Sequence, residues 1–308
     1  LIKNLKENNP IYLLPDGKAF IIPQEWFSKF GSIAKYAQIR QEKLQISKSN
    51  YALLEAVPEI KPQNLVEKVS YTPSPNLRAT LRPYQIEGVE WLLQHYYNGV
   101  GACLADDMGL GKTLQTIAFL TSQVTEDSRI LILAPSGLIY NWADEFRKFA
   151  PQLDLAVVHG LKANREAILS ENHQIYVTSY ATFRQDSELY QEMAFDFLFL
   201  DEAQVMKNAQ TKIAQSLRQF VVPAVFALSG TPIENHLGEL WSIFQIVLPG
   251  LLPNKKEFMK LPADRVAQFI KPFVMRRKKE EVLTELPDLI EVVYKNELED
   301  QQKAIYLA

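Results

Sequence analysis

The chain has 308 residues, 47% of them hydrophobic, which is enough to bury the core of one large domain or of two smaller ones. Its formal net charge of -3 excludes an overall basic protein that coats nucleic acid, so any phosphate-binding surface must be local. A single cysteine excludes an internal disulfide framework, and no apolar run approaches the roughly 18 residues that span a bilayer, so we expect a reducing compartment and no membrane segment.

Residues 1–75 differ in character from the residues that follow. Residues 11–23, IYLLPDGKAFIIP, predict two short strands around a Pro-Asp-Gly turn, since Asp and Gly accept turn geometry that β-branched residues avoid. Residues 24–44 carry apolar and aromatic side chains at helical spacing and predict a helix. Residues 71–83, YTPSPNLRATLRP, contain three prolines that a helix interior does not accept, so we place a domain boundary there, between residues 75 and 76.

After this boundary the chain alternates between short apolar runs and helix-length segments. Continuous apolar strands separated by helices predict an α/β fold with a parallel sheet covered on both faces, in which ligands bind beyond the carboxyl ends of the strands. Cys103 lies in the first run, where we expect a buried thiol. From about 236 to 275 the alternation stops, and we expect helical insertions. The runs are ACLA (102–105), ILILA (130–134), LAVVHG (155–160), IYVTSY (175–180), FLFLD (197–201) and AVFALSG (224–230).

Residues 104–116, LADDMGLGKTLQT, are the candidate for a phosphate-binding loop. The pattern G-x-x-x-x-G-K-[ST] asks for glycine where Asp106 stands, but a non-glycine residue is acceptable there if the backbone stays at negative φ. Gly109 and Gly111 can take positive φ and direct N–H groups at an anion, Lys112 would reach the β and γ phosphates, and Thr113 would coordinate Mg²⁺. Taken alone, these residues also fit a chance Gly-Leu-Gly turn followed by a lysine.

Two acids, Asp201 and Glu202, end the run FLFL at the predicted ligand edge of the sheet. Asp201 would hold Mg²⁺ through water, and Glu202 would orient and deprotonate an attacking water. A strand followed by two acids is also typical of a solvated strand end or a helix cap. The combination with the loop is what favours the catalytic interpretation.

Two further segments add polar groups. Ser229, Gly230 and Thr231 follow the run AVFAL and could report the occupancy of a phosphate site, or could form a simple Gly-Pro turn. Gln85, in LRPYQIEGVEWL, could read adenine because its amide offers a donor and an acceptor together, or could be a polar residue at a helix start.

Six segments resemble, in order and at plausible separations, the successive helicase motifs of the Swi/Snf-like family: LRPYQIEGVEWL, DDMGLGKT, LILAPSGLIYNWADEF, VTSY, DEAQ and LSGTPIENHLGELWSIF. That family consists of ATP-driven double-stranded DNA translocases within the second helicase superfamily. In its members this loop usually has the sequence D-E-M-G-L-G-K-T. Asp106 therefore belongs to the pattern, and Asp107 departs from it by standing where the family usually has Glu. The resemblance covers about residues 76–308, while residues 1–75 are similar to the end of an accessory region of bacterial members.

The resemblance implies the first RecA-like lobe of such a translocase, with ATP and Mg²⁺ bound and double-stranded DNA as partner. It implies catalytic roles for Lys112, Asp201 and Glu202, and metal binding by Thr113 and Asp201. The implied nucleotide-binding residues are Arg82, Gln85, Met108, Gly109, Leu110, Gly111, Lys112 and Thr113. The residues implied to couple the ATP site to DNA are Gln204, Ser229, Gly230 and Thr231. Those implied to contact the DNA backbone, through hydroxyls and N–H groups, are Pro135, Ser136, Thr178 and Ser179.

A basic stretch, FVMRRKKEEVLTELPD at 273–288, is similar to the one that precedes the crossing to the second lobe of the family. Glu280 and Glu281 follow Arg276 and Arg277 by four residues, a spacing equally typical of a solvated helix face, so contact with DNA stays open. The same alternatives apply to the lysines of the predicted insertions, which are Lys255, Lys256 and Lys260.

We therefore expect the ATP-binding lobe of a DNA-dependent ATPase that translocates on double-stranded DNA to remodel protein–DNA complexes. We also expect a piece of a longer chain whose second lobe supplies an arginine, a group commonly worth about 10³ to 10⁵ in rate. The 308 residues alone would then bind nucleotide weakly and hydrolyse it slowly. The expected location is the bacterial cytoplasm at the nucleoid, or the nucleus if the source is eukaryotic.

Two other functions fit the same residues. The parent protein could be an ATP-driven motor that displaces a protein partner such as a transcription complex, with residues 1–75 as docking surface and little direct dependence on DNA. Alternatively, the lobe could be degenerate and kept as a binding module. The presence of Lys112, Thr113, Asp201 and Glu202 argues against degeneration.

Overall fold

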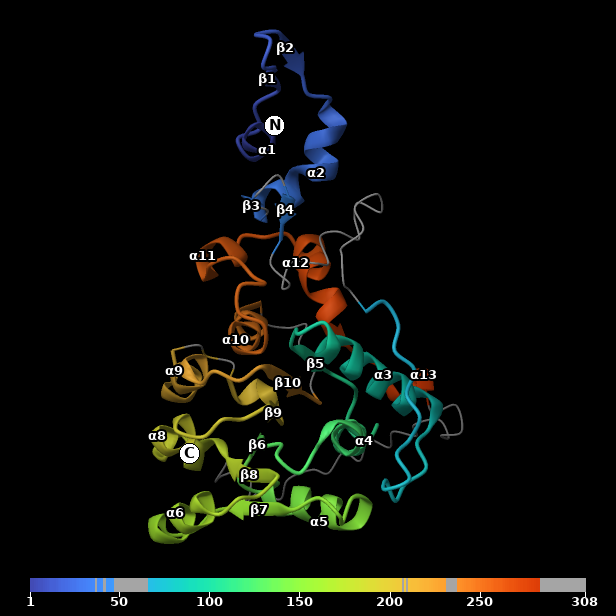
Figure 1. Cartoon of the computed structure of the whole chain (residues 1–308), viewed down its shortest axis with the longest axis vertical. Helices are drawn as coiled ribbons and strands as arrows, with labels where there is room; N and C mark the ends of the chain where they lie inside the picture. The colour runs from blue at the N-terminus through green and yellow to red at the C-terminus, as the bar shows by residue number, and fades with distance from the viewer. Residues whose placement is uncertain are drawn as a thin grey trace, which may run out of the picture.

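The computed structural model describes residues 1–36, 38–40, 43–46, 66–206, 208, 210–230 and 237–282. Its centre is a seven-stranded sheet of order β11-β5-β10-β9-β6-β8-β7, in which every neighbouring pair is parallel (Figure 1). The six predicted runs form six of these strands, so the predicted parallel α/β sheet is confirmed. The strands are β5 (Ala102–Leu104), β6 (Ile130–Ala134), β7 (Leu155–Val158), β8 (Ile175–Ser179), β9 (Phe197–Leu200), β10 (Ala224–Leu228) and β11 (Val274–Met275).

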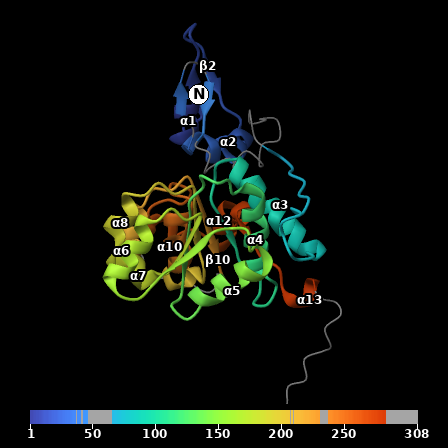
Figure 2. The ribbon, with the colours of Figure 1, turned by 60° about the horizontal axis from the view of Figure 1, so that its bottom comes forward.

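Helices cover both faces of the sheet (Figures 1 and 2). Side chains alternate along a strand, so Ile130 and Ile132 of β6 pack into one apolar cluster and Leu131 and Leu133 into the other. The first cluster is closed by α3 (Pro83–Tyr97), α4 (Lys112–Gln123) and α5 (Ile139–Phe149). The second is closed by α6 (Lys162–Ser170), α7 (Tyr180–Gln185), α8 (Ser187–Gln191), α9 (Lys212–Gln219), α10 (Leu237–Val247), α11 (Lys255–Phe258) and α12 (Ala263–Ile270).

The strand register places four chain segments at one edge of the sheet. Leu104 of β5 pairs with Leu228 of β10, and Leu200 of β9 pairs with Leu133 of β6. β10 pairs with β9 as well as with β5. Because all these strands run parallel, the residues that follow each of them emerge together, which brings the predicted loop and the predicted acids to the same edge.

The segment 66–82 lies along α3 before the helix begins. Val66 and Asn98 exchange hydrogen bonds of 2.8 and 3.1 Å, and the N–H of Tyr71 donates to Glu90 at 3.0 Å. The hydroxyl of Tyr71 also donates to the carbonyl of Ala118 at 3.2 Å. Residues on the N-terminal side of the predicted boundary therefore pack on the sheet domain, and the boundary between residues 75 and 76 stays a prediction.

The N-terminal elements gather at one end of the molecule (Figures 1 and 2). The predicted hairpin forms, with antiparallel pairing around the turn at Gly17. The helix predicted over 24–44 is wrong beyond Tyr36, because the polar-apolar-polar triplets 38–40 and 43–45 fit a period of two and pair as strands. These elements are α1 (Ile2–Lys6), β1 (Ile11–Leu13), β2 (Ala19–Ile21), α2 (Gln24–Tyr36), β3 (Gln38–Arg40) and β4 (Lys43–Gln45).

The C-terminal part of the sheet domain holds the predicted helices α10, α11 and α12, followed by the short helix η4 (Lys271–Phe273). The strand β11 and the helix α13 (Lys279–Val282) come next. β11 was not predicted, because two apolar residues before a basic run give no periodic signal. It adds to the sheet edge beside β5.

Two expectations from composition can be compared with the structure. Cys103 is buried in the sheet, and burial raises the pKa of its thiol to about 12, which confirms a buried, unreactive side chain. Within the described part of the chain, no helix combines the length and the apolar character that crossing a membrane requires.

Candidate nucleotide-binding site

A pocket of about 320 Å³ opens at the carboxyl edge of the sheet. Its walls come from the loop after β5, from the start of α4, from the first turns of α5 and from the acids after β9. Most of the predicted loop residues and both predicted acids are therefore on one surface. The lining residues are Met108, Gly109, Gly111, Lys112, Thr113, Leu114, Leu138, Asn141, Trp142, Glu145, Asp201 and Glu202.

The loop after β5 has the backbone that an anion cradle requires. Gly109 and Gly111 take φ of 87° and 77°, in the left-handed region that side chains disfavour. Leu110 between them is fully buried and anchors the turn. Gly111 is the N-cap of the twelve-residue helix α4, so the unpaired N–H groups and the positive end of the helix dipole face the pocket. This backbone geometry favours the phosphate-loop interpretation over a chance turn.

Lys112 places its ammonium at the base of this cradle. Its Nζ donates to the carbonyl oxygens of Asp106 at 2.7 Å and Asp107 at 3.3 Å. Burial lowers the pKa of Lys112, while the nearby carboxylates of Asp106, Glu202 and Asp201 act in the opposite direction. The hydrogen-bond partners are neutral carbonyls, which phosphate oxygens can replace with a gain in charge pairing.

Asp201 is buried and is held by two neutral donors. The indole Nε1 of Trp142 donates to its Oδ2 at 2.8 Å, and the backbone N–H of Glu202 donates to its Oδ1 at 3.0 Å. Burial raises the pKa of Asp201, and the bond from Trp142 partly offsets that rise. Tyr180 supports the same residue by donating its hydroxyl to the Asp201 carbonyl at 2.7 Å. A carboxylate without a cationic side chain bonded to it is suited to bind a metal cation.

Trp142 is a site residue that the sequence analysis missed. Trp142 is buried on α5, four residues after the pocket residue Leu138, and its sequence position alone indicates only packing. The available signal was its N–H, since a buried indole needs an acceptor and the strand ends supply the nearest carboxylates.

Glu202, Gln204 and Ser229 form a hydrogen-bonded chain beside the pocket. Glu202 has a positive φ of 48°, which a non-glycine residue adopts only where its surroundings hold it. Gln204 donates from Nε2 to Glu202 Oε2 at 2.5 Å, and Ser229 Oγ donates to Gln204 Oε1 at 3.1 Å. Gly230 follows, close to Met108 and to the ammonium of Lys112. Thr231, predicted with this group, lies outside the described residues.

The structure brings Gln85 to the loop. Its Oε1 accepts from the N–H of Arg82 at 2.9 Å, and its Nε2 donates to the Leu110 carbonyl at 3.2 Å. Both residues stand at the start of α3, and neither lines the pocket. Contact of Gln85 with adenine and nucleotide binding by Arg82 stay predictions, but the hydrogen bond from Gln85 to the loop is a structural fact.

The donor set fits a nucleoside triphosphate with Mg²⁺. The loop offers N–H groups and Lys112 to phosphate, while the Thr113 hydroxyl and the Asp201 carboxylate offer oxygen ligands beside it. Among the described residues, no three His, Cys, Asp or Glu side chains cluster as a metal cage. Mg²⁺ does not require one, because it retains waters and binds through one or two carboxylates plus substrate phosphates.

The four residues predicted to contact DNA fall into two groups. Pro135 and Ser136 follow β6, where Ser136 is exposed. Thr178 is 0% exposed and donates to the Val158 carbonyl at 2.7 Å. Ser179 is 2% exposed, and its Oγ caps α7 by accepting from the N–H of Thr182 at 3.1 Å. The hydroxyls of Thr178 and Ser179 are thus engaged inside the lobe, and contact with DNA stays a prediction for all four.

The side chains of the basic stretch differ in exposure. Arg277 is turned inward and pairs with the buried Asp106, whereas Lys278 and Lys279 are exposed. Lys255, Lys256 and Lys260 are exposed as well. The solvated-face interpretation is therefore wrong for Arg277.

Comparison with known proteins identifies the family of the chain. The family model for the SNF2-related domain matches residues 84–308. A curated relative from Bacillus subtilis, the putative ATP-dependent helicase/translocase YwqA, is 40% identical in an alignment over 254 residues that covers 76% of this chain and 27% of the relative. The nuclear protein STH1/NPS1 of Saccharomyces cerevisiae is 31% identical over 271 residues, covering 78% of this chain and 20% of that protein.

The solved SWI2/SNF2 ATPase core of Sulfolobus solfataricus in complex with dsDNA is 39% identical, with a TM-score of 0.65, over 77% of this chain and 53% of that one. The solved SWI2/SNF2 ATPase core domain of Sulfolobus solfataricus is 38% identical, with a TM-score of 0.62, over 77% of this chain and 51% of that one. These likenesses confirm the sheet as the RecA-like lobe of such a core. The chain spans about a quarter of the length of the first curated relatives it matches. It belongs to the SNF2-related domain family.

Proposed function

We propose that this chain is the ATP-binding lobe of a DNA-dependent ATPase that translocates on double-stranded DNA and remodels protein–DNA complexes. The observation that carries the proposal is convergence at one pocket. The left-handed glycines of the loop, Lys112 and the acids Asp201 and Glu202 come from chain positions about ninety residues apart and line the same surface. The name of the Bacillus subtilis relative and the DNA in the solved archaeal complex support the wider function.

Each residue has a part in this proposal. Lys112 exchanges its two carbonyl partners for phosphate oxygens, and the N–H groups around Gly109 and Gly111 hold the same anion. Thr113 and Asp201 hold Mg²⁺, which when bound neutralises phosphate charge. Glu202, oriented by Gln204, accepts a proton from the attacking water.

The chain from Gln204 through Ser229 to Gly230 lies between this pocket and the end of β10. We assign it, with Thr231, the role of transmitting nucleotide occupancy to the DNA-binding surface. Pro135, Ser136, Thr178 and Ser179 contact the DNA backbone in this proposal, through hydroxyls and backbone N–H groups. The second lobe supplies an arginine to the transferring phosphoryl group, and the protein acts at the nucleoid of a bacterial cytoplasm.

The test is steady-state ATP hydrolysis with duplex DNA, single-stranded DNA, RNA or no nucleic acid. For the protein with both lobes, we expect duplex DNA to give the largest stimulation. For the 308-residue chain alone we expect slow hydrolysis in all four conditions. Robust duplex-stimulated turnover by this chain alone would contradict the role given to a second lobe.

A second candidate is a motor that displaces a protein partner with little direct dependence on DNA. The burial of Thr178 and Ser179 and the net charge of -3 favour it. One relative, 33% identical, is the TATA-binding protein-associated factor MOT1 of Saccharomyces cerevisiae. Hydrolysis that responds equally to all four conditions would support this candidate over the first.

A further inference from the structure

Asp106 occupies the loop position where the generic pattern has glycine, and its surroundings explain the acid. The side chain is 0% exposed and does not line the pocket. A carboxylate taken fully out of water must be paired and hydrogen-bonded, or it costs several kcal/mol or becomes protonated. Asp106 must therefore have a strong partner within the protein.

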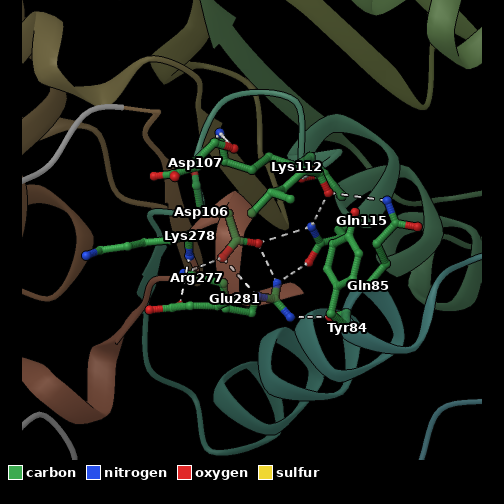
Figure 3. Close-up of polar contacts among 11 residues, drawn as sticks. Tyr84, Gln85, Asp106, Asp107, Lys112, Gln115, Arg277, Lys278 and Glu281 are labelled. Atoms are coloured by element: carbon green, nitrogen blue, oxygen red, sulfur yellow. Dashed lines mark hydrogen bonds and ion pairs between the residues drawn. The ribbon is translucent and has the colours of Figure 1, made fainter. Parts of the chain in front are cut away.

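That partner is Arg277, which stands 171 residues later in the sequence. Its Nε donates to Asp106 Oδ1 at 3.0 Å, its Nη2 donates to Oδ2, and its backbone N–H also donates to Oδ1 at 3.1 Å. This fork-to-carboxylate geometry is specific to arginine, because an ammonium group cannot reproduce two parallel bonds. Figure 3 shows the guanidinium facing the Asp106 carboxylate.

The same guanidinium joins two helices to the loop (Figure 3). Its Nη1 donates to the Tyr84 carbonyl at the start of α3, and its Nη2 donates to Gln115 Oε1 of α4 at 2.9 Å. Gln115 in turn donates from Nε2 to Asp106 Oδ2 and to the Leu110 carbonyl, each at 3.3 Å. The network thus ends on Leu110, the residue between the two loop glycines.

Packing around this network leaves no spare room. Gly88 of α3 faces the Gln115 amide, and a Cβ built at Gly88 would lie 2.8 Å from Arg277 Nη2 and still closer to Gln115 Oε1. The Arg277 guanidinium also lies 5.4 Å from the centre of the Tyr84 ring. The position of the Arg277 guanidinium therefore depends on the present arrangement of α3, α4 and the loop.

The backbone around Arg277 is docked on the loop as well. β11 pairs with β5, and the N–H of Ala105 donates to the Met275 carbonyl at 2.7 Å. The N–H of Asp107 donates to the Arg277 carbonyl at 3.0 Å, and the N–H of Lys279 donates to Asp107 Oδ2 at 3.2 Å. The segment 274–279 therefore runs beside the loop, first as the edge strand β11 and then without regular structure, before α13 begins at Lys279.

We propose that Arg277 is a positioning residue for nucleotide binding, which couples the geometry of the phosphate loop to the docking of segment 274–279. The inference rests on the proposed function, because it takes the loop to bind the phosphates of a nucleotide. Nucleotide binding and docking of the segment stabilise the same arrangement of Leu110, Gln115 and Asp106. By reciprocity each strengthens the other.

The test measures the Kd of a fluorescent N-methylanthraniloyl-ADP with Mg²⁺ for the whole 308-residue chain and its variants. We expect Arg277→Gln and Asp106→Asn each to raise this Kd about tenfold, and the double variant to raise it no further than the single ones. Arg277→Lys keeps the charge without the fork and should fall between these variants and the wild type. The control Lys278→Gln removes the same charge from the adjacent exposed residue and should leave the Kd within about twofold.

A second readout separates positioning from simple stabilisation. Hydrogen exchange of fragments covering residues 274–279 is followed with and without ADP and Mg²⁺. We expect ADP to slow this exchange in the wild type and in Lys278→Gln, and not in Arg277→Gln. A purely structural ion pair would lower the unfolding midpoint of Arg277→Gln but leave the Kd of the folded variant and the effect of ADP unchanged, and that result would overturn the proposal.

The outcomes distinguish this inference from the proposed function. A wild-type chain that binds no ADP contradicts both. A wild-type chain that binds ADP with the same Kd as folded Arg277→Gln contradicts the inference alone. If Arg277→Gln does not fold, the Kd of Arg277→Lys and the hydrogen exchange of the wild type decide. A wild-type exchange rate of residues 274–279 that is the same with and without ADP overturns the coupling.

Discussion

Asp106 and Asp201 follow two strands of the same sheet edge and are both buried, yet their partners are opposite in kind. Asp106 receives the guanidinium of Arg277 and lies behind the loop. Asp201 receives only neutral N–H groups, from Trp142 and Glu202, and lines the pocket. A carboxylate neutralised within the protein can hold backbone segments in place. A carboxylate left without a bonded cation keeps the capacity to bind one from solution, at some cost in stability.

The largest effect we predict concerns function at Asp201. Asp201→Asn keeps the shape and an acceptor oxygen but removes the charge that would hold Mg²⁺. ATP hydrolysis by the protein with both lobes should fall about 10³-fold, or about 4 kcal/mol. The assay is steady-state phosphate release at saturating ATP. Asp144→Asn changes an exposed aspartate of α5 and should retain activity, and comparable losses in both variants would contradict the assignment.

The second prediction concerns stability at Asp106. Asp106→Asn leaves Arg277 as a largely buried cation without its counterion, which should lower the free energy of unfolding by about 3 kcal/mol. Asp201→Asn should lower that free energy by less, because it loses one acceptor oxygen but leaves no buried cation without a counterion. Urea unfolding followed by circular dichroism compares the two variants. Equal destabilisation by both would remove the distinction between the two aspartates.

A smaller effect is expected from the donor that orients Asp201. Trp142→Phe keeps most of the packing on α5 but deletes the N–H bonded to Asp201. The Mg²⁺ concentration needed for half-maximal ADP binding should rise about tenfold, as for partners that orient metal ligands in general. The matched control is Trp241→Phe, which deletes an indole N–H bonded to the Pro253 carbonyl on the other face of the sheet. An unchanged Mg²⁺ requirement in Trp142→Phe would show that the indole contributes only packing and that its N–H does not orient Asp201.

The smallest effect concerns pH and the residues that precede the segment 274–279. His95 is buried on α3, with Nδ1 2.8 Å from the Trp91 carbonyl and Nε2 2.8 Å from the Pro272 carbonyl. Burial lowers the pKa of His95, and the two carbonyls only partly offset this. In the unfolded chain the His95 side chain has a pKa of about 6.5, so as the pH falls it is protonated in the unfolded chain before it is protonated in the folded one.

Stability from this group is fully present above about pH 6.5 and is lost as the pH falls from there toward the lowered folded pKa. The free energy of unfolding should fall between pH 8 and pH 5.5, and this fall should be about 1 kcal/mol smaller in His95→Gln than in the wild type. His159→Gln, at an exposed histidine, should keep the wild-type difference. A His95→Gln profile parallel to that of the wild type would contradict this source of pH dependence.

Much of the fold and of the pocket follows from local patterns. The six strands were predictable because each is a continuous apolar run, and a parallel sheet requires such runs. The loop was predictable because Gly109, Gly111, Lys112 and Thr113 are adjacent in sequence, and Asp201 because it directly follows a strand. Parallel topology then brings these separate patterns to one edge without further information.

What could not be predicted depends on contacts between distant segments. Arg277 lies in a charged run whose spacing equally suits a solvated helix, and only the docking of β11 turns it toward Asp106. Trp142 lies among the apolar residues of α5, and its bond to Asp201, which joins residues 59 positions apart, cannot be inferred from local sequence. Thr178 and Ser179 matched a motif, but the motif does not encode that their hydroxyls bond within the lobe.

The central claim is that the pocket between the loop and Asp201 binds Mg²⁺ and ATP, and the most direct measurement is titration of the 308-residue chain with ATP by calorimetry. We predict saturable binding of one ATP, which weakens when Mg²⁺ is removed. In Lys112→Ala the Kd for ATP should rise about a hundredfold or more. Lys162→Ala, at an exposed lysine of α6, should bind as the wild type does. Lys112→Ala that folds and binds ATP with wild-type affinity would contradict the account.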